Sequence, residues 1–137
     1  MALQNQAHVL ADGLKDLDAA LVAVTKAAQL YPEYAPAVAG RAVVLARLGR
    51  REEAHKEIER ARLLSDDAQI TYQAACVYAL TSAKNAEDKP KAIALIRQAF
   101  REGYGDAKNL ATDNDLDALR SSRDFLDVQQ AAVSLFR

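Results

Sequence analysis

Small and branched apolar residues recur along the chain in one arrangement, with polar and charged residues between them. Ala20 and Ala27 lie seven residues apart with Val24 between them, and the arrangement returns 34 residues later and again after a further 38. The later copies are Ala54, Ile58 and Ala61, and then Ala92, Ile96 and Ala99. Two alanines at this spacing lie on one face of a helix and let a neighbouring helix approach closely. A fixed period of this length predicts a repeat solenoid.

Turn and capping residues divide this pattern into separate helices. Pro32 ends the second helix, and Gly49 is well placed to close the third in a left-handed conformation. Asp16 or Asp18 is expected to cap the second helix. The six helices expected before the tail cover residues 3–14, 17–30, 35–48, 51–64, 69–83 and 90–103. The chain is therefore predicted to be all-α.

The tail from Gly105 onward predicts short helical turns and then one final helix. Ser121 and Asp124 have the spacing of a capping box, so we expect the final helix to begin there and to pack on the sixth helix. The apolar faces expected to be buried are Leu17, Leu21, Val24, Ala27, Ala28 and Leu30; Ala54, Ile58, Ala61 and Leu64; Ala92, Ile93, Ile96, Ala99 and Phe100; and Phe125, Leu126, Val128, Ala132, Val133, Leu135 and Phe136.

Composition supports helices and excludes several classes of protein. Hydrophobic residues make up 50% of the chain but aromatic residues only 6%, so alanine does much of the apolar packing. The formal net charge of -1 provides no global field that would recruit nucleic acid or an anionic membrane. Residues 1–14 lack the pattern of a signal peptide, and no apolar run reaches the ~18 residues of a membrane span. We therefore expect a cytoplasmic protein with no nucleic-acid or membrane partner.

Few residues offer catalytic or metal chemistry. Cys76 is the single cysteine, so no internal disulfide forms, and we expect its thiol to be buried and inert. His8 and His55 fall in different repeats and make a weak metal pair. The acids Asp113, Asp115 and Asp117 lack the glycine and the later glutamate of a calcium loop, so helix capping is the better interpretation. The sequence predicts no enzyme, no catalytic residue, no metal and no cofactor.

The middle of the chain is locally basic. Its cations are Arg41, Arg47, Arg50, Arg51, Lys56, Arg60 and Arg62. Four glutamates lie among them, and Glu52 and Lys56 have the favourable order of a helical i,i+4 pair. A salt-bridged face in water is a better interpretation than an RNA-binding stripe, because the stretch has no aromatic residues on which bases could stack.

The residues of the repeated pattern resemble the tetratricopeptide repeat (TPR) family, a helix–turn–helix of about 34 residues. The resemblance covers residues 16–103 and is best in the runs Leu48–Ala54 and Ile58–Ala61. It implies a single domain at 1–137, a right-handed solenoid of three units at 1–34, 35–68 and 69–106 with capping helices at 107–137. The tail from Tyr104 to Phe125 is similar to the segment that closes many bacterial TPR proteins, including TPR regions of large serine/threonine kinases. That similarity implies a bacterial protein and a chain that is part of a longer one.

In the TPR family the first helices of the units line a concave surface that takes a peptide or a helix. The matching positions here are Asn5, Val9, Ala39, Gly40, Val43, Arg47, Gln73, Ala74 and Val77. We therefore expect a scaffolding module that binds a protein or peptide partner, which the sequence does not identify. The alternative is a structural spacer or self-association module of a larger protein, with no separate ligand.

Overall fold

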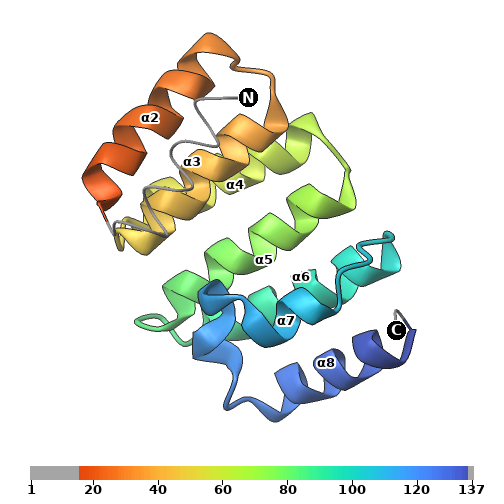
Figure 1. Cartoon of the computed structure of the whole chain (residues 1–137). Helices are drawn as coiled ribbons and strands as arrows, with labels where there is room; N and C mark the ends of the chain where they lie inside the picture. The colour runs from red at the N-terminus through yellow and green to blue at the C-terminus, as the bar shows by residue number, and fades with distance from the viewer. Residues whose placement is uncertain (1–15, 136–137) are drawn as a thin grey trace. The chain divides into compact units, whose positions relative to one another are not determined.

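The computed structural model describes residues 16–135 of the chain and shows helices joined by short turns (Figure 1). The chain divides into two compact units, Met1–Asp66 and Asp67–Arg137. The described residues contain α-helices and one 3₁₀ helix and no strand, which confirms the predicted all-α, TPR-like fold class. The helix expected at 3–14 lies outside the described residues.

The first unit contains α2 (Leu17–Leu30), α3 (Ala35–Arg47) and α4 (Arg51–Leu64), and each helix packs on the next. The Asp16 carboxylate accepts a hydrogen bond of 3.0 Å from the Ala19 N–H, so Asp16 is the cap of α2. Gly49 has φ +79°, the left-handed conformation that glycine adopts without strain, and it turns the chain from α3 into α4. Both residues do what the sequence predicts.

Alanine lets the helices of this unit come close together. Ala20 and Val24 of α2 form one apolar cluster with Val44 of α3. The alanines predicted to face inward on α4, Ala54 and Ala61, are fully buried, and so is Ile58 between them. The predicted inward faces of α2 and α4 are thus confirmed at these positions.

Leu30 and Leu64 were expected on the same faces, and that expectation is wrong. Leu30 is 56% exposed and Leu64 is 39% exposed. Each is the last residue of its helix and follows the buried Ala27 or Ala61 by three positions, which is ~300° of helical rotation. This rotation carries the leucine to the edge of the buried arc, and no following turn covers it.

The second unit contains α5 (Ala68–Ser82), α6 (Asp88–Arg101), α7 (Lys108–Thr112), the 3₁₀ helix η2 (Asn114–Leu119) and α8 (Arg123–Leu135). Helix α5 pairs with α6 along its length, and η2 also packs on α5. Helix α6 begins two residues earlier than Pro90 predicts. The buried Asp88 lies in its first turn and accepts a 2.7 Å hydrogen bond from the Thr81 hydroxyl, and a carboxylate is favourable at a helix N-terminus.

The final helix α8 packs on α6, as predicted, and contacts α7 (Figure 1). Phe125, Val128 and Ala132 are buried as expected. Leu126 and Val133 are 47% and 41% exposed, so the expectation that they widen the buried stripe is wrong. The helix also starts at Arg123 with the Ser122 carbonyl accepting from the Leu126 N–H, which is one residue later than the predicted Ser121 box.

Candidate functional site

The residues predicted to line a concave groove that the structure describes lie on α3 of the first compact unit and on α5 of the second. On α3, Ala39 and Val43 are buried, and Gly40 and Arg47 are half-buried. Asn5 and Val9 lie outside the described residues. That the residues of α3 and those of α5 form one groove stays a prediction.

On α5, Ala74 and Val77 are buried and Gln73 is half-buried. The side-chain oxygen of Gln73 is shielded from solvent and accepts no hydrogen bond from any residue in the described range 16–135. Buried polar atoms usually have a partner, and one left without costs about 1–3 kcal/mol. Gln73 is therefore the residue of this set with an unused hydrogen-bond acceptor.

A polar network joins the three helices of the first unit. Arg41 of α3 donates to the Thr25 hydroxyl of α2 at 3.1 Å and forms an ion pair with Glu57 of α4. Arg60 also pairs with Glu57, at 3.2 Å, and its other guanidinium nitrogen donates to the Pro32 carbonyl at 2.6 Å. The planar guanidinium suits this role because it donates in several fixed directions.

This network was missed in the sequence, although a signal for it exists. Thr25, Arg41 and Glu57 are separated by 16 residues each, which is the interval between facing positions of successive helices here. When residues at this 16-residue interval are polar on three successive helices, as they are here, polar contacts between the helices are expected. Arg41 of α3 thus contacts both neighbouring helices, α2 and α4.

The basic stretch of the middle helices is largely neutralised by glutamates. Arg50 pairs with Glu53, and Arg62 pairs with Glu59, both three residues apart on the chain. The expected Glu52–Lys56 pair does not form within the described residues, and apart from Arg41–Glu57 the pairs given for this stretch have i,i+3 spacing. A face of paired charges favours the solvated interpretation over a stripe that binds nucleic acid.

The structure brings together Cys76 of α5 with Asp113 and Asp115, whose potential ligand atoms all lie within 4.8 Å of one another. Asp113 is already hydrogen-bonded, because its Oδ2 accepts from the Tyr72 hydroxyl at 2.9 Å and its Oδ1 accepts from the Asp115 N–H at 3.0 Å. Burial, and then the carboxylates of Asp113 and Asp115, raise the pKa of the Cys76 thiol well above its ordinary value. The Asp113 carboxylate is already engaged by Tyr72 and by the first turn of η2, so we interpret the cluster as a structural network.

The network extends to two more residues of the tail. Asn109 of α7 donates to the Tyr72 hydroxyl at 3.2 Å and to the Tyr104 hydroxyl at 3.1 Å. The rings of Tyr72 and Tyr104 are stacked with centroids 4.2 Å apart. Sequence spacing gives no sign of these contacts, because Tyr72 and Asp113 are 41 residues apart. The predicted capping role of Asp113 is confirmed, and so is the burial of Cys76.

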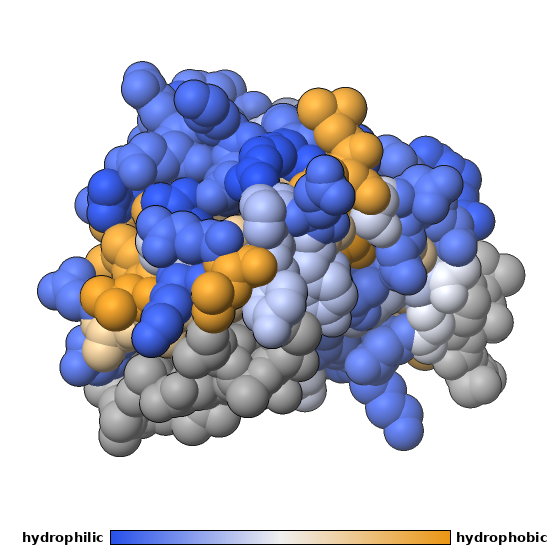
Figure 2. Space-filling view, turned by 90° about the horizontal axis from the view of Figure 1, so that it is seen from above, coloured by the Kyte–Doolittle hydropathy of each residue, from blue (hydrophilic) through white to orange (hydrophobic). Residues whose placement is uncertain are grey.

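The surface seen in Figure 2 is mainly hydrophilic, with apolar residues in small separate groups. The most exposed large apolar side chains are Leu63 of α4, at 90%, and Val22 of α2, at 71%. Leu30, Tyr31 and Tyr34 are also exposed around the turn between α2 and α3. Scattered apolar residues of this kind are normal on a protein surface and do not by themselves define a site.

The profile of the tetratricopeptide repeat family matches residues 13–76, which contain α2, α3, α4 and the first part of α5. The match supports the assignment of this segment to the TPR family. A comparison with curated proteins gave no match. None of the helices in the described range is long and apolar enough to cross a membrane. TPR repeats generally mediate protein–protein interaction or scaffolding and are typically not catalytic.

Proposed function

We propose that this protein is an interaction module that binds a peptide or helix of a protein partner along the first helices of its repeats, α3 and α5. The observation that carries the proposal is the TPR match over residues 13–76, together with helices that pack pairwise as TPR helices do. Arg47 and Gln73 are the polar residues of the predicted set on α3 and α5, and both are half-buried. A guanidinium and an amide there would fix the orientation of a bound segment.

Val43 is a poor position at which to test the proposal by mutation, because its side chain is buried. A glutamate at Val43, which is only 8% exposed, would bury a charge and lower stability as well as binding. Arg47→Glu places the charge at a half-buried position instead. Gln73→Glu keeps the shape of the side chain but puts a carboxylate where the Gln73 oxygen is shielded from solvent, so its stability has to be measured beside its binding. Lys56→Glu of α4 is the matched control for Arg47→Glu, since it makes the same change in charge at an exposed residue.

The experiment is quantitative capture of partners from a native lysate by the full chain and the three variants. We expect Arg47→Glu and Gln73→Glu to lose the same partners, and Lys56→Glu to retain them. Circular dichroism and a thermal melt of each variant report whether the fold is kept. Equal recovery by all four folded proteins would place binding elsewhere, and a concentration-dependent dimer that Arg47→Glu disrupts would favour self-association.

A further inference from the structure

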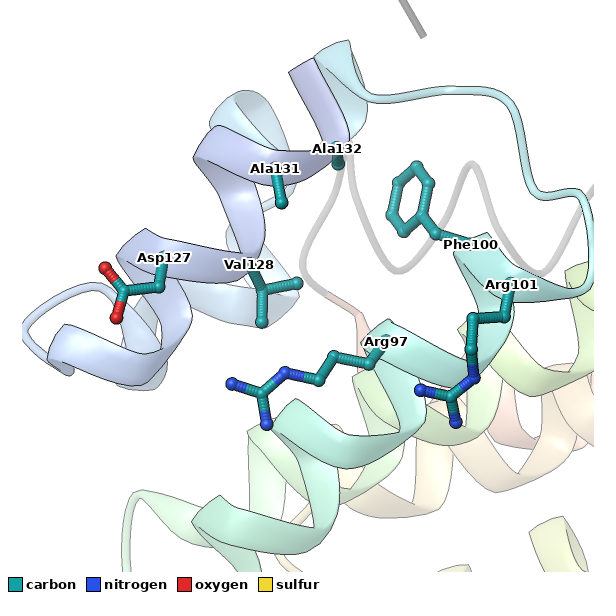
Figure 3. A pocket seen from close by; sticks show the side chains of 7 residues that line it. All are labelled: Arg97, Phe100, Arg101, Asp127, Val128, Ala131 and Ala132. Atoms are coloured by element: carbon teal, nitrogen blue, oxygen red, sulfur yellow. The ribbon is translucent and has the colours of Figure 1, made fainter. Parts of the chain in front are cut away.

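Helices α6 and α8 enclose a surface groove of about 410 Å³ in the second unit. Figure 3 shows its two walls, one of which is formed by Arg97, Phe100 and Arg101 of α6. The wall of α8 contributes Asp127, Val128, Ala131 and Ala132. Helix α8 contacts α6 less extensively than α5 does, and two of the residues that α8 contributes to the lining are alanines.

The groove has an apolar floor and a positively charged edge. Its lining is apolar where Phe100, Val128 and Ala132 meet, and these three side chains are almost wholly buried. Ala131 is exposed and lies at the opening. In Figure 3, Arg97 extends from α6 towards Val128 on the opposite helix. The groove therefore offers a short apolar depression with a cationic edge.

The charges of the two arginines of this edge are not neutralised by any residue that the structure describes. Arg97 and Arg101 are exposed, and neither makes an ion pair or hydrogen bond within residues 16–135. They are four residues apart on α6, so their Cα atoms are separated by ~6 Å along the helix. The carboxylate across the groove, Asp127, is directed to Arg123 of its own helix at 3.7 Å. The arginines of the basic stretch in the first unit, by contrast, are mostly paired with glutamates.

We propose that the groove between α6 and α8 binds an acidic, amphipathic peptide segment of a protein partner. One large apolar side chain of the segment fills the depression over Val128 and Ala132, and carboxylates about one helical turn apart pair with Arg97 and Arg101. Arginine suits this task because its planar fork matches a carboxylate. The site uses no residue of the predicted α3 and α5 surface, so it is a second docking site beyond the proposed function.

The form of the groove favours a peptide over a small molecule. Small-molecule sites enclose most of the ligand, whereas this groove is open along one side, with both arginines and Ala131 in contact with solvent. A helix or extended segment can place one side chain in such a depression and keep its own backbone outside. Amphipathic segments are recognised in grooves between helices in this way.

The test is a selection of random 12-residue peptides on the immobilised full chain, repeated with the Arg97→Glu/Arg101→Glu double variant. Wild type should enrich peptides in which Glu or Asp flanks Leu, Ile or Phe, and the variant should lose that enrichment. The best peptide, labelled with a fluorophore, should bind the variant about tenfold more weakly or worse, and wild-type binding should weaken as salt is added.

Two further variants separate the groove from a general charge effect. Lys84→Glu/Lys108→Glu makes the same change in net charge at exposed residues of the same unit and should leave the affinity within about twofold. Ala131→Trp fills the opening without changing charge and should abolish binding, while circular dichroism shows a folded protein. Enriched peptides without acidic residues would overturn the proposal, as would equal affinity for the Arg97→Glu/Arg101→Glu variant. A dimer of this chain that this variant dissociates would overturn it too.

Discussion

The hydroxyl of Tyr72 donates a 2.9 Å hydrogen bond to Asp113, and this contact connects α5 to the residue that caps η2. Asp113 thereby joins the tail to the repeat helices with one oxygen and holds the first turn of η2 with the other. Arg120 secures the other end of the same segment, because its guanidinium donates to the carbonyls of Leu110 and Asp113 at 2.8 and 2.7 Å.

Tyr72→Phe should destabilise the protein, because it leaves the half-buried Asp113 carboxylate without one of its donors. We expect a loss of about 1–2 kcal/mol in the free energy of unfolding, measured by urea denaturation at pH 7. Tyr31→Phe removes a hydroxyl from an exposed ring and should change stability by less than about 0.5 kcal/mol. Equal stabilities of the two variants would show that the Tyr72–Asp113 contact contributes little.

Stability should fall at alkaline pH, and Cys76 should account for part of the loss. The folded protein raises the pKa of the thiol, so the unfolded chain ionises first. The stabilisation by the neutral thiol is fully present below the unfolded pKa of about 8.5 and is lost as pH rises above it. At pH 9.5 the expected loss relative to pH 7 is on the order of 1 kcal/mol.

The pH prediction is checked by urea denaturation of wild type and Cys76→Ala at pH 7, 8.5 and 9.5. The slope of stability against pH should be smaller for Cys76→Ala, whatever its stability at pH 7. Tyr72, whose pKa is raised mainly by burial, adds a loss that begins only near pH 10 and remains in both proteins. Parallel slopes below pH 9.5 would contradict a buried, neutral thiol.

Ala61→Leu should overpack the first unit. Ala61 is fully buried on α4, and extra methylene groups in a filled core typically cost about 1–3 kcal/mol. The matched control is Ala94→Leu on the exposed side of α6, where the same change should be nearly neutral. Thermal melts of both variants check the result, and an unchanged melting temperature for Ala61→Leu would mean that the helix can move aside.

Truncation after Arg123 tests whether α8 is a cap. Its removal exposes the apolar surface of α6 and discards Phe125, which is fully buried and lies beneath the Arg120 guanidinium at 5.8 Å. Each large buried side chain is worth about 1.5–3 kcal/mol, so we expect a loss of several kcal/mol and a tendency to aggregate. A truncated protein as stable as wild type, with stronger peptide binding, would instead identify α8 as an occupant of a binding surface.

Local rules were sufficient to predict much of this fold. The alanine pairs around Ile58 identified the buried face of α4, and Asp16 and Gly49 marked the helix ends, because caps and helical periodicity depend on neighbours within a few residues. The same periodicity failed at Leu30 and Leu64, where burial depends on whether another element covers the end of the helix. The spacing of apolar residues shows that Leu30 and Leu64 continue the apolar face, but it does not show whether another helix packs over them.

The contacts that distinguish this chain could not be predicted from local spacing. The packing of the final helix on α6 was predicted, but the spacing of residues does not show which side chains of α8 lie opposite Arg97 and Arg101. The hydrogen bond between Tyr72 and Asp113 depends on the packing of η2 on α5, which local spacing does not predict. The predicted α3 and α5 groove has the same limit, since its residues were assigned from a family pattern and their joint geometry stays a prediction.

The contact between Tyr72 and Asp113 also bears on how such a chain evolves. Repeat proteins lengthen by duplication of a helical pair, and each new pair must dock on the apolar face of the last one. In the second unit η2 packs on α5 and is held there by a directional hydrogen bond. A duplicated pair inserted after α6 would separate Tyr72 from Asp113 and break the hydrogen bond between them. The hydroxyl of Tyr72 thus sets a limit on the growth of the array at this end.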